Sequence, residues 1–156
     1  MPRTQQLEIA ADLDNLKQAR DFVEETTQLA GLDEDRTGEL LLAVDEAVTN
    51  IVMHGCPQGG CTIELEFEGE PDACIIRIRD NAKLFDPTAM LEPDLDIPPM
   101  ERDAPGGFGV YLFKHLVDQT SYRVTRDGRN ELTLLKRMAE TNMSGAGAAE
   151  RVLNGE

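Results

Sequence analysis

Apolar residues recur with a helical period in two stretches of the first third of the chain. From Asp14, which suits a helix N-cap, residues 15–31 carry an apolar side chain every three or four positions and end at a glycine. Residues 33–54 open with acidic side chains, which suit a helix N-terminus, and are followed by a glycine, a proline and two more glycines. The pattern predicts two helices, preceded by a short edge strand at residues 5–10.

Alternation with a period of two takes over after the second predicted helix. In residues 61–70 large apolar side chains alternate with glutamates, and in residues 73–80 isoleucines alternate with arginines. The join GEPD has turn chemistry, so these stretches are expected to form a β-hairpin with one polar face. A short helix at residues 108–119 and a further strand, turn and strand over residues 120–137 complete the predicted elements.

The order of these elements predicts the fold class. Two or three helices can cover one face of a mixed, mostly antiparallel sheet and leave its charged face in solvent, which is a two-layer α/β (α+β) sandwich. The length of 156 residues suits one domain, here residues 1–138, and residues 139–156 are expected to form a disordered tail. Residues 81–109 hold five of the eight prolines without periodicity, which is typical of a functional or disordered loop.

Composition and charge narrow the functional classes. No apolar run approaches the roughly 18 residues of a membrane span, and the N-terminus shows no secretory signal, so a cytoplasmic protein is expected. The formal net charge of −15 argues against a nucleic-acid binder and favours protein partners, although it can equally serve solubility alone. The three cysteines, Cys56, Cys61 and Cys74, are odd in number and lack C-x-x-C spacing, so reduced thiols are expected rather than a disulfide or a zinc site.

Polar residues in the second predicted helix mark the first candidate site. In the stretch DEAVTNIVMHG, Glu46 and Asn50 stand four residues apart on one helix face, with His54 along the same stripe. A carboxamide oxygen can complete a Mg²⁺ shell of phosphate oxygens and water, and a carboxylate one turn away can take a proton from an attacking hydroxyl. The alternative is the solvated face of an amphipathic helix.

Two further motifs follow along the chain. Asp80 ends a predicted strand, where its carboxylate can accept a hydrogen bond from an exocyclic amine such as that of adenine, or can simply begin a turn. In PGGFGVYLF, Gly106, Gly107 and Gly109 lead into a helix whose free N–H groups can bind phosphate, or form a hinge between loop and helix. This stretch is not a P-loop, because no G-K-[ST] follows.

In their order and spacing, these motifs resemble the Bergerat-type (GHKL) ATPases, the superfamily of gyrase B, MutL and histidine kinases. Within it, AVDEAVTNIVMHG, LFDP, GGFGVYLFKHLVD and YRVTRDGRNELTLLKR are most similar to the bacterial anti-sigma-factor serine/threonine kinases of the RsbW and SpoIIAB type. The resemblance covers about residues 7–137. It implies a Bergerat ATP-binding fold with ATP/ADP and Mg²⁺ as cofactors.

The resemblance also implies a role for each matching position. Asn50 would hold Mg²⁺ against the phosphates, Glu46 would be the general base for the target hydroxyl, and Asp80 would recognise the adenine amine. Residues 88–105 match the ATP lid, and Ala82 replaces a glycine that lets the family's backbone pass close to the base. The other positions expected near the nucleotide are His54, Phe85, Gly106, Gly107, Phe108, Gly109, Val110 and Asn130. For His54 the alternative is a packed, hydrogen-bonded histidine of the helix.

The function implied by the resemblance is that of a switch kinase. Such a protein binds Mg-ATP, phosphorylates a small STAS-type antagonist protein, and binds a sigma factor or similar regulator by partner switching, as a homodimer. Two alternatives remain open, namely a nucleotide-regulated binding module without kinase activity and an ATPase without a protein acceptor. Glu46 favours the kinase, since a pure binder needs Asn50 more than a base, whereas Ala82 mildly favours the binding module.

Overall fold

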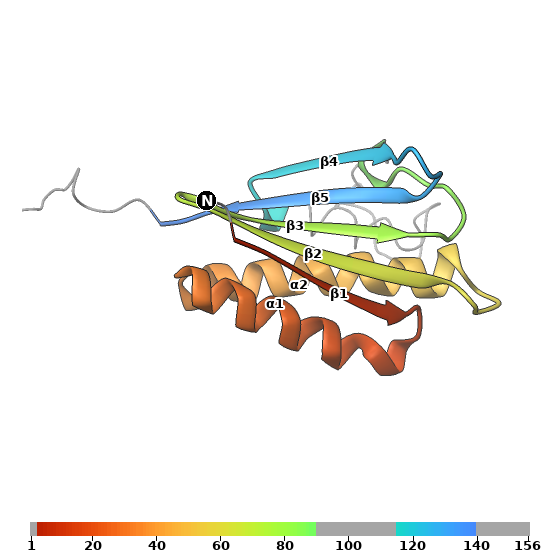
Figure 1. Ribbon diagram of the computed structural model, residues 1–156, viewed down its shortest axis with the longest axis horizontal. Helices are drawn as coiled ribbons and strands as arrows, with labels where there is room; N and C mark the ends of the chain where they lie inside the picture. The colour runs from red at the N-terminus through yellow and green to blue at the C-terminus, as the bar shows by residue number, and fades with distance from the viewer. Residues whose placement is uncertain (1–2, 90–114, 140–156) are drawn as a thin grey trace, which may run out of the picture.

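The computed structural model describes residues 3–89 and 115–139, which form a five-stranded sheet with helices on one face (Figure 1). The order across the sheet is β1-β2-β3-β5-β4, and all four described pairings are antiparallel. The predicted two-layer sandwich is therefore confirmed, with no parallel pair among the described strands. The strands are β1 (Arg3–Ala10), β2 (Thr62–Glu70), β3 (Ala73–Asp80), β4 (Gln119–Val124) and β5 (Asn130–Arg137).

The first helix of the covering layer is α1 (Leu16–Ala30), which follows the short 3-10 helix η1 (Leu13–Asn15). It ends at Gly31, whose φ of 94° lies in the left-handed region that glycine adopts without strain. The predicted cap at Asp14 is wrong. The Asp12 carboxylate accepts a hydrogen bond from the Asp14 N–H and so caps η1 ahead of α1.

The second helix, α2 (Glu34–Asn50), begins where the Asp33 side chain accepts a hydrogen bond from the Arg36 N–H at 2.8 Å. Beyond Asn50 the helix widens into a π-helix, η2 (Ile51–Gly55), which the Cys56 N–H closes by donating to the Ile51 carbonyl. The helix predicted over 33–54 is therefore of two kinds. Because the last turn is wider than an α-helical turn, a spacing of four residues no longer places position 54 on the helix face that carries the predicted polar stripe.

The core lies between α1, α2 and the helix-facing side of the sheet (Figure 1). Alternation along β2 and β3 sends every second side chain to this side, and the predicted inward residues are indeed buried there. No helix within the described ranges is long and apolar enough to cross a bilayer. The completely buried large side chains include Phe67, Leu40, Ile63, Leu65, Ile76, Leu134 and Val23.

The opposite face of the sheet carries a ladder of paired charges. The register aligns Glu64, Arg79, Glu131 and Arg123 across β2, β3, β5 and β4. Arg79 contacts three carboxylates, those of Glu131 at 2.6 Å, Glu66 at 2.7 Å and Glu64 at 3.0 Å. Only 16% of the Arg79 side chain and 4% of the Glu131 side chain are exposed, so ion pairs shield the middle of this face, whereas Arg123 at its edge is 65% exposed.

Candidate functional site

The site residues predicted within the described ranges come from element ends that meet at one end of the sheet (Figure 1). β3 ends at Asp80, β5 begins at Asn130, and the strand register pairs these two residues directly. By strand alternation both side chains lie on the helix-covered face. η2 ends beside the segment that follows β3, where the Gly55 carbonyl accepts a hydrogen bond from the Lys83 N–H at 3.2 Å.

Asp80 is a buried carboxylate with one occupied and one unoccupied oxygen. Only 4% of the residue is exposed, and burial raises the pKa of its carboxyl group against the opposing effect of its hydrogen bonds. Its Oδ1 accepts hydrogen bonds from Asn130 Nδ2 at 2.9 Å and from the Ala82 N–H at 3.0 Å. Among the described residues, Oδ2 has no donor. A buried acceptor in this state fits a ligand that brings a donor, such as an exocyclic amine.

Asn130 uses its whole carboxamide within the protein. Its Nδ2 donates to Asp80 Oδ1 and to the Lys83 carbonyl at 3.1 Å, while its Oδ1 accepts from the Phe85 N–H at 3.0 Å and from the Tyr122 hydroxyl. Two donor hydrogens and two lone pairs are the full capacity of this group. The structure therefore places Asn130 against Asp80, and neither this contact nor the participation of Tyr122 follows from the sequence pattern.

Glu46 and Asn50 lie one turn apart near the end of α2, and both are half-buried. Within the part of the chain that the structure describes, neither side chain has a hydrogen-bond or ion-pair partner. The adjacent carboxylate, Asp45, is by contrast held by Arg20 Nε at 2.8 Å. Of two neighbouring acids, only Glu46 therefore stays available for a proton or a ligand, and half-burial disfavours the alternative of a fully solvated face.

The remaining described positions differ in their exposure. His54 is exposed on the π-helical turn, and Phe85, within the segment that follows β3, is 52% exposed. Ala82, at the position of the family's glycine, faces Gly55, which has no side chain to collide with its methyl group. In the sequence, the signal for this close approach of η2 to Ala82 is the glycine that ends the stretch DEAVTNIVMHG.

The stretch predicted to bind phosphate lies outside the described residues. This applies to Gly106, Gly107, Phe108, Gly109 and Val110, and to the predicted lid from residue 90 onward. The helix predicted over 108–119 is described only from residue 115. Residues 115–116 are helical, but the predicted end is wrong, because residues 117–118 are not helical and β4 begins at Gln119.

The prediction of three reduced thiols is wrong for two of the cysteines. Cys56 and Cys61 form a disulfide, because a turn containing Gly59 and Gly60 at φ 79° and 89° brings their Cα atoms to 6.2 Å. Cys74 is the free thiol, and its burial raises its pKa to about 11. No group of three or more metal-ligating side chains is present in residues 3–89 and 115–139.

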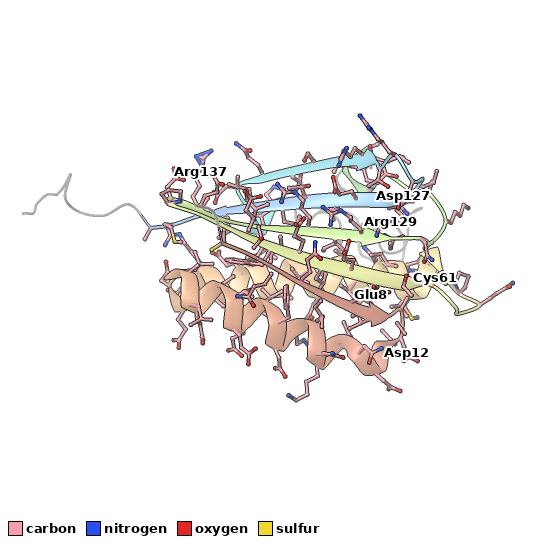
Figure 2. All side chains as sticks on the ribbon, viewed as in Figure 1. Glu8, Asp12, Cys61, Asp127, Arg129 and Arg137 are labelled. Atoms are coloured by element: carbon pink, nitrogen blue, oxygen red, sulfur yellow. A yellow bond between two sulfur atoms is a disulfide. The ribbon has the colours of Figure 1, made fainter. Side chains whose placement is uncertain are left out.

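The disulfide lies at the candidate site. Cys61 lies at the same end of the molecule as the β4–β5 turn, marked by Asp127 and Arg129 in Figure 2. Just before the disulfide loop, the Gly55 carbonyl accepts a hydrogen bond from the Lys83 N–H. Just after the loop, the Thr62 N–H donates a hydrogen bond to Asn81 Oδ1 at 2.9 Å. The disulfide therefore joins two segments that both hold residues 81–83.

A profile described as histidine kinase-like ATPase domain matches residues 9–136, most of the chain. The chain belongs to the histidine kinase-like ATPase family. Among curated members, the serine/threonine-protein kinase BtrW of Bordetella bronchiseptica is 37% identical over 101 residues, covering 64% of this chain and 70% of BtrW. The serine-protein kinase RsbW of Halalkalibacterium halodurans is 28% identical over 125 residues, covering 78% of this chain and 76% of RsbW.

A solved structure supports the fold of this histidine kinase-like ATPase. The crystal structure of the RsbU and RsbW domains of Rv1364c from Mycobacterium tuberculosis superposes with a TM-score of 0.59 at 15% identity, over 89% of this chain and 33% of that chain. At this identity the likeness speaks for the fold alone. Together with BtrW and RsbW, the family match confirms the predicted RsbW-type serine/threonine kinase and implies ATP binding.

Proposed function

We propose that this chain transfers the γ-phosphoryl group of Mg-ATP to a serine or threonine of a small STAS-type antagonist protein. It then controls a sigma factor or similar regulator by exchanging partners, as a cytoplasmic homodimer. The observation that carries the catalytic part is the half-buried Glu46 carboxylate, which has no partner among the described residues and lies one turn before Asn50. The partner classes rest on the resemblance to RsbW-type kinases.

The described residues fit a nucleotide at both of its ends. Asp80 Oδ2, buried and without a donor among the described residues, would accept the adenine amine, with Ala82 and Phe85 bordering the base. Asn50 would hold Mg²⁺, because its carboxamide oxygen is a hard ligand and is not used by a described protein group. When bound, the cation would offset the phosphate charge. His54, Asn130 and residues 106–110 complete the proposed nucleotide site.

Glu46 is the proposed general base. The hydroxyl oxygen of the acceptor forms a bond to the γ-phosphorus, the bond from that phosphorus to the bridging oxygen of ADP breaks, and the hydroxyl proton passes to Glu46. ADP leaves with the bonding electrons, and Glu46 later returns its proton to water. Asp45 is not available for this role because Arg20 holds both of its oxygens at 2.8 Å.

A second candidate function is a nucleotide-regulated binding module with little or no transfer activity. The observation that favours it is Ala82, which adds a methyl group beside the expected base. Against it, the residue that faces this methyl group across the contact with η2 is Gly55, which has no side chain to collide with it. An unpaired Glu46 also has no use in a module that only binds.

The test is incubation of the purified chain with γ-labelled ATP and a small STAS-type protein as the acceptor. Transfer of label to a serine or threonine of that protein supports the kinase, and an acceptor with this residue replaced by alanine is the control. Release of label only as phosphate supports an ATPase. ATP binding without either outcome supports the binding module.

A further inference from the structure

Asp80 can offer a ligand only one of its two oxygens, and other residues determine which one. Oδ1 is saturated by the donors of Asn130 and Ala82, at 2.9 and 3.0 Å, whereas Oδ2 has no donor among the described residues. With only 4% of the residue exposed, solvent has little access to the unfilled oxygen. The ligand therefore meets an acceptor whose direction is fixed by the protein.

The Asn130 carboxamide has only one orientation that its neighbours allow. The backbone N–H of Phe85 can only donate, so the atom it meets at 3.0 Å must be the amide oxygen. The NH₂ group then faces the Asp80 carboxylate and the Lys83 carbonyl, which both accept. The Tyr122 hydroxyl donates to the same amide oxygen, so a directed chain of hydrogen bonds runs from Tyr122 through Asn130 to Asp80.

We infer that Asn130 and Tyr122 are positioning residues that set base selectivity, because they hold Asp80 as a pure acceptor toward the six-position of a purine. The inference rests on the proposed function, in which this site binds the base of ATP. Adenine presents an amine donor at that position, whereas hypoxanthine presents a carbonyl. Two acceptors that face each other in a buried site weaken binding roughly 10- to 100-fold.

Loss of this hydrogen-bond chain has a specific consequence for selectivity. Without the Asn130 NH₂ group, the Asp80 carboxyl can rotate or take up a proton, and a protonated carboxyl can donate to a carbonyl. Discrimination between amine and carbonyl then falls. A change that merely loosens the site weakens both nucleotides equally and leaves their ratio unchanged.

The experiment measures the dissociation constants of Mg-ATP and Mg-ITP by titration calorimetry for the wild type, Tyr122→Phe, Asn130→Ser and a Ser121→Ala control. Ser121 is the neighbouring residue on β4, is exposed, and points to the opposite face of the strand. We expect ITP to bind the wild type and Ser121→Ala roughly 10- to 100-fold more weakly than ATP. The ratio should fall several-fold in Tyr122→Phe and further in Asn130→Ser.

The outcomes separate this inference from the proposed function. A wild type that binds no ATP overturns both, whereas one that binds ATP and ITP equally overturns only the inference. Variants that weaken both nucleotides while the ratio stays at the wild-type value also overturn it, because they reveal a purely structural role. Thermal unfolding checks that each variant is folded. If Asn130→Ser is not folded, Tyr122→Phe decides, since it removes a single oxygen atom.

Discussion

A methyl group on Gly55 would lie 3.2 Å from the Cβ of Ala82, so η2 and the segment after β3 meet with little space between them. The hydrogen bond from the Lys83 N–H to the Gly55 carbonyl fixes the same approach. The helix that carries Glu46 and Asn50 is thereby attached directly to the segment that follows Asp80. In the proposed site, this contact sets the distance between the phosphate side and the base side.

Gly55→Ala should therefore weaken ATP binding several-fold and lower the free energy of unfolding by about 1–2 kcal/mol, as overpacking does. The matched control is Gly38→Ala in α2, the helix that precedes η2, where an added Cβ has no neighbour within 4 Å. That change should raise the free energy of unfolding by about 0.5–1 kcal/mol and leave ATP affinity unchanged. Urea unfolding and titration calorimetry measure both quantities. Equal ATP affinity in the two variants would contradict the role given to the Gly55 contact.

Reduction of the Cys56–Cys61 disulfide should lower the free energy of unfolding by about 2 kcal/mol, because it releases a closed loop of only a few residues. Urea unfolding with and without dithiothreitol measures the difference, and the double variant Cys56→Ser, Cys61→Ser should not respond to the reductant. Cys74 serves as an internal control. Its buried thiol, with a pKa of about 11, should resist alkylation by iodoacetamide until the protein unfolds. A wild-type stability that does not depend on the reductant would argue against the disulfide.

Asp80→Asn should abolish ATP binding while stabilising the protein in a pH-dependent way. Burial raises the folded-state pKa of Asp80, so the unfolded chain ionises first as the pH rises, and the wild type loses stability between the two pKa values. The variant lacks this loss. The difference in free energy of unfolding between the variant and the wild type should therefore rise with pH from about pH 4, near the pKa of an aspartate in the unfolded chain, and then level off. Urea unfolding of both proteins across this range measures the trend, and a relative stability that falls with pH would refute it.

The sequence predicts the features that depend on local pattern. Alternating isoleucine and arginine in residues 73–80 determine which side of β3 is buried, and the GEPD join allows a tight hairpin, so strand positions and fold class follow from the chain itself. The four-residue spacing of Glu46 and Asn50 likewise predicts that they share one helix face.

Other features depend on contacts between distant segments and could not be predicted in this way. The contacts of Asn130 join residues 80, 83, 85 and 122, and no spacing in the sequence indicates that set. The disulfide depends on two positive-φ glycines that fold the chain back between Cys56 and Cys61, while cysteine counting alone favoured free thiols. The availability of Glu46 likewise follows from an ion pair between Arg20 and Asp45, which belong to different helices.

The most direct test of the proposed kinase compares transfer of γ-label to the acceptor protein with ATP affinity in Glu46→Gln, Asn50→Ala and the control Asp45→Asn. We predict that Glu46→Gln binds ATP like the wild type but transfers label roughly 100-fold more slowly or worse, as expected for loss of a general base. Asn50→Ala should lose both binding and transfer. Asp45→Asn should retain both, since the side chain of its partner Arg20 is 52% exposed and such an ion pair contributes little. Transfer of label by Glu46→Gln at the wild-type rate would contradict the assignment of Glu46 as the base.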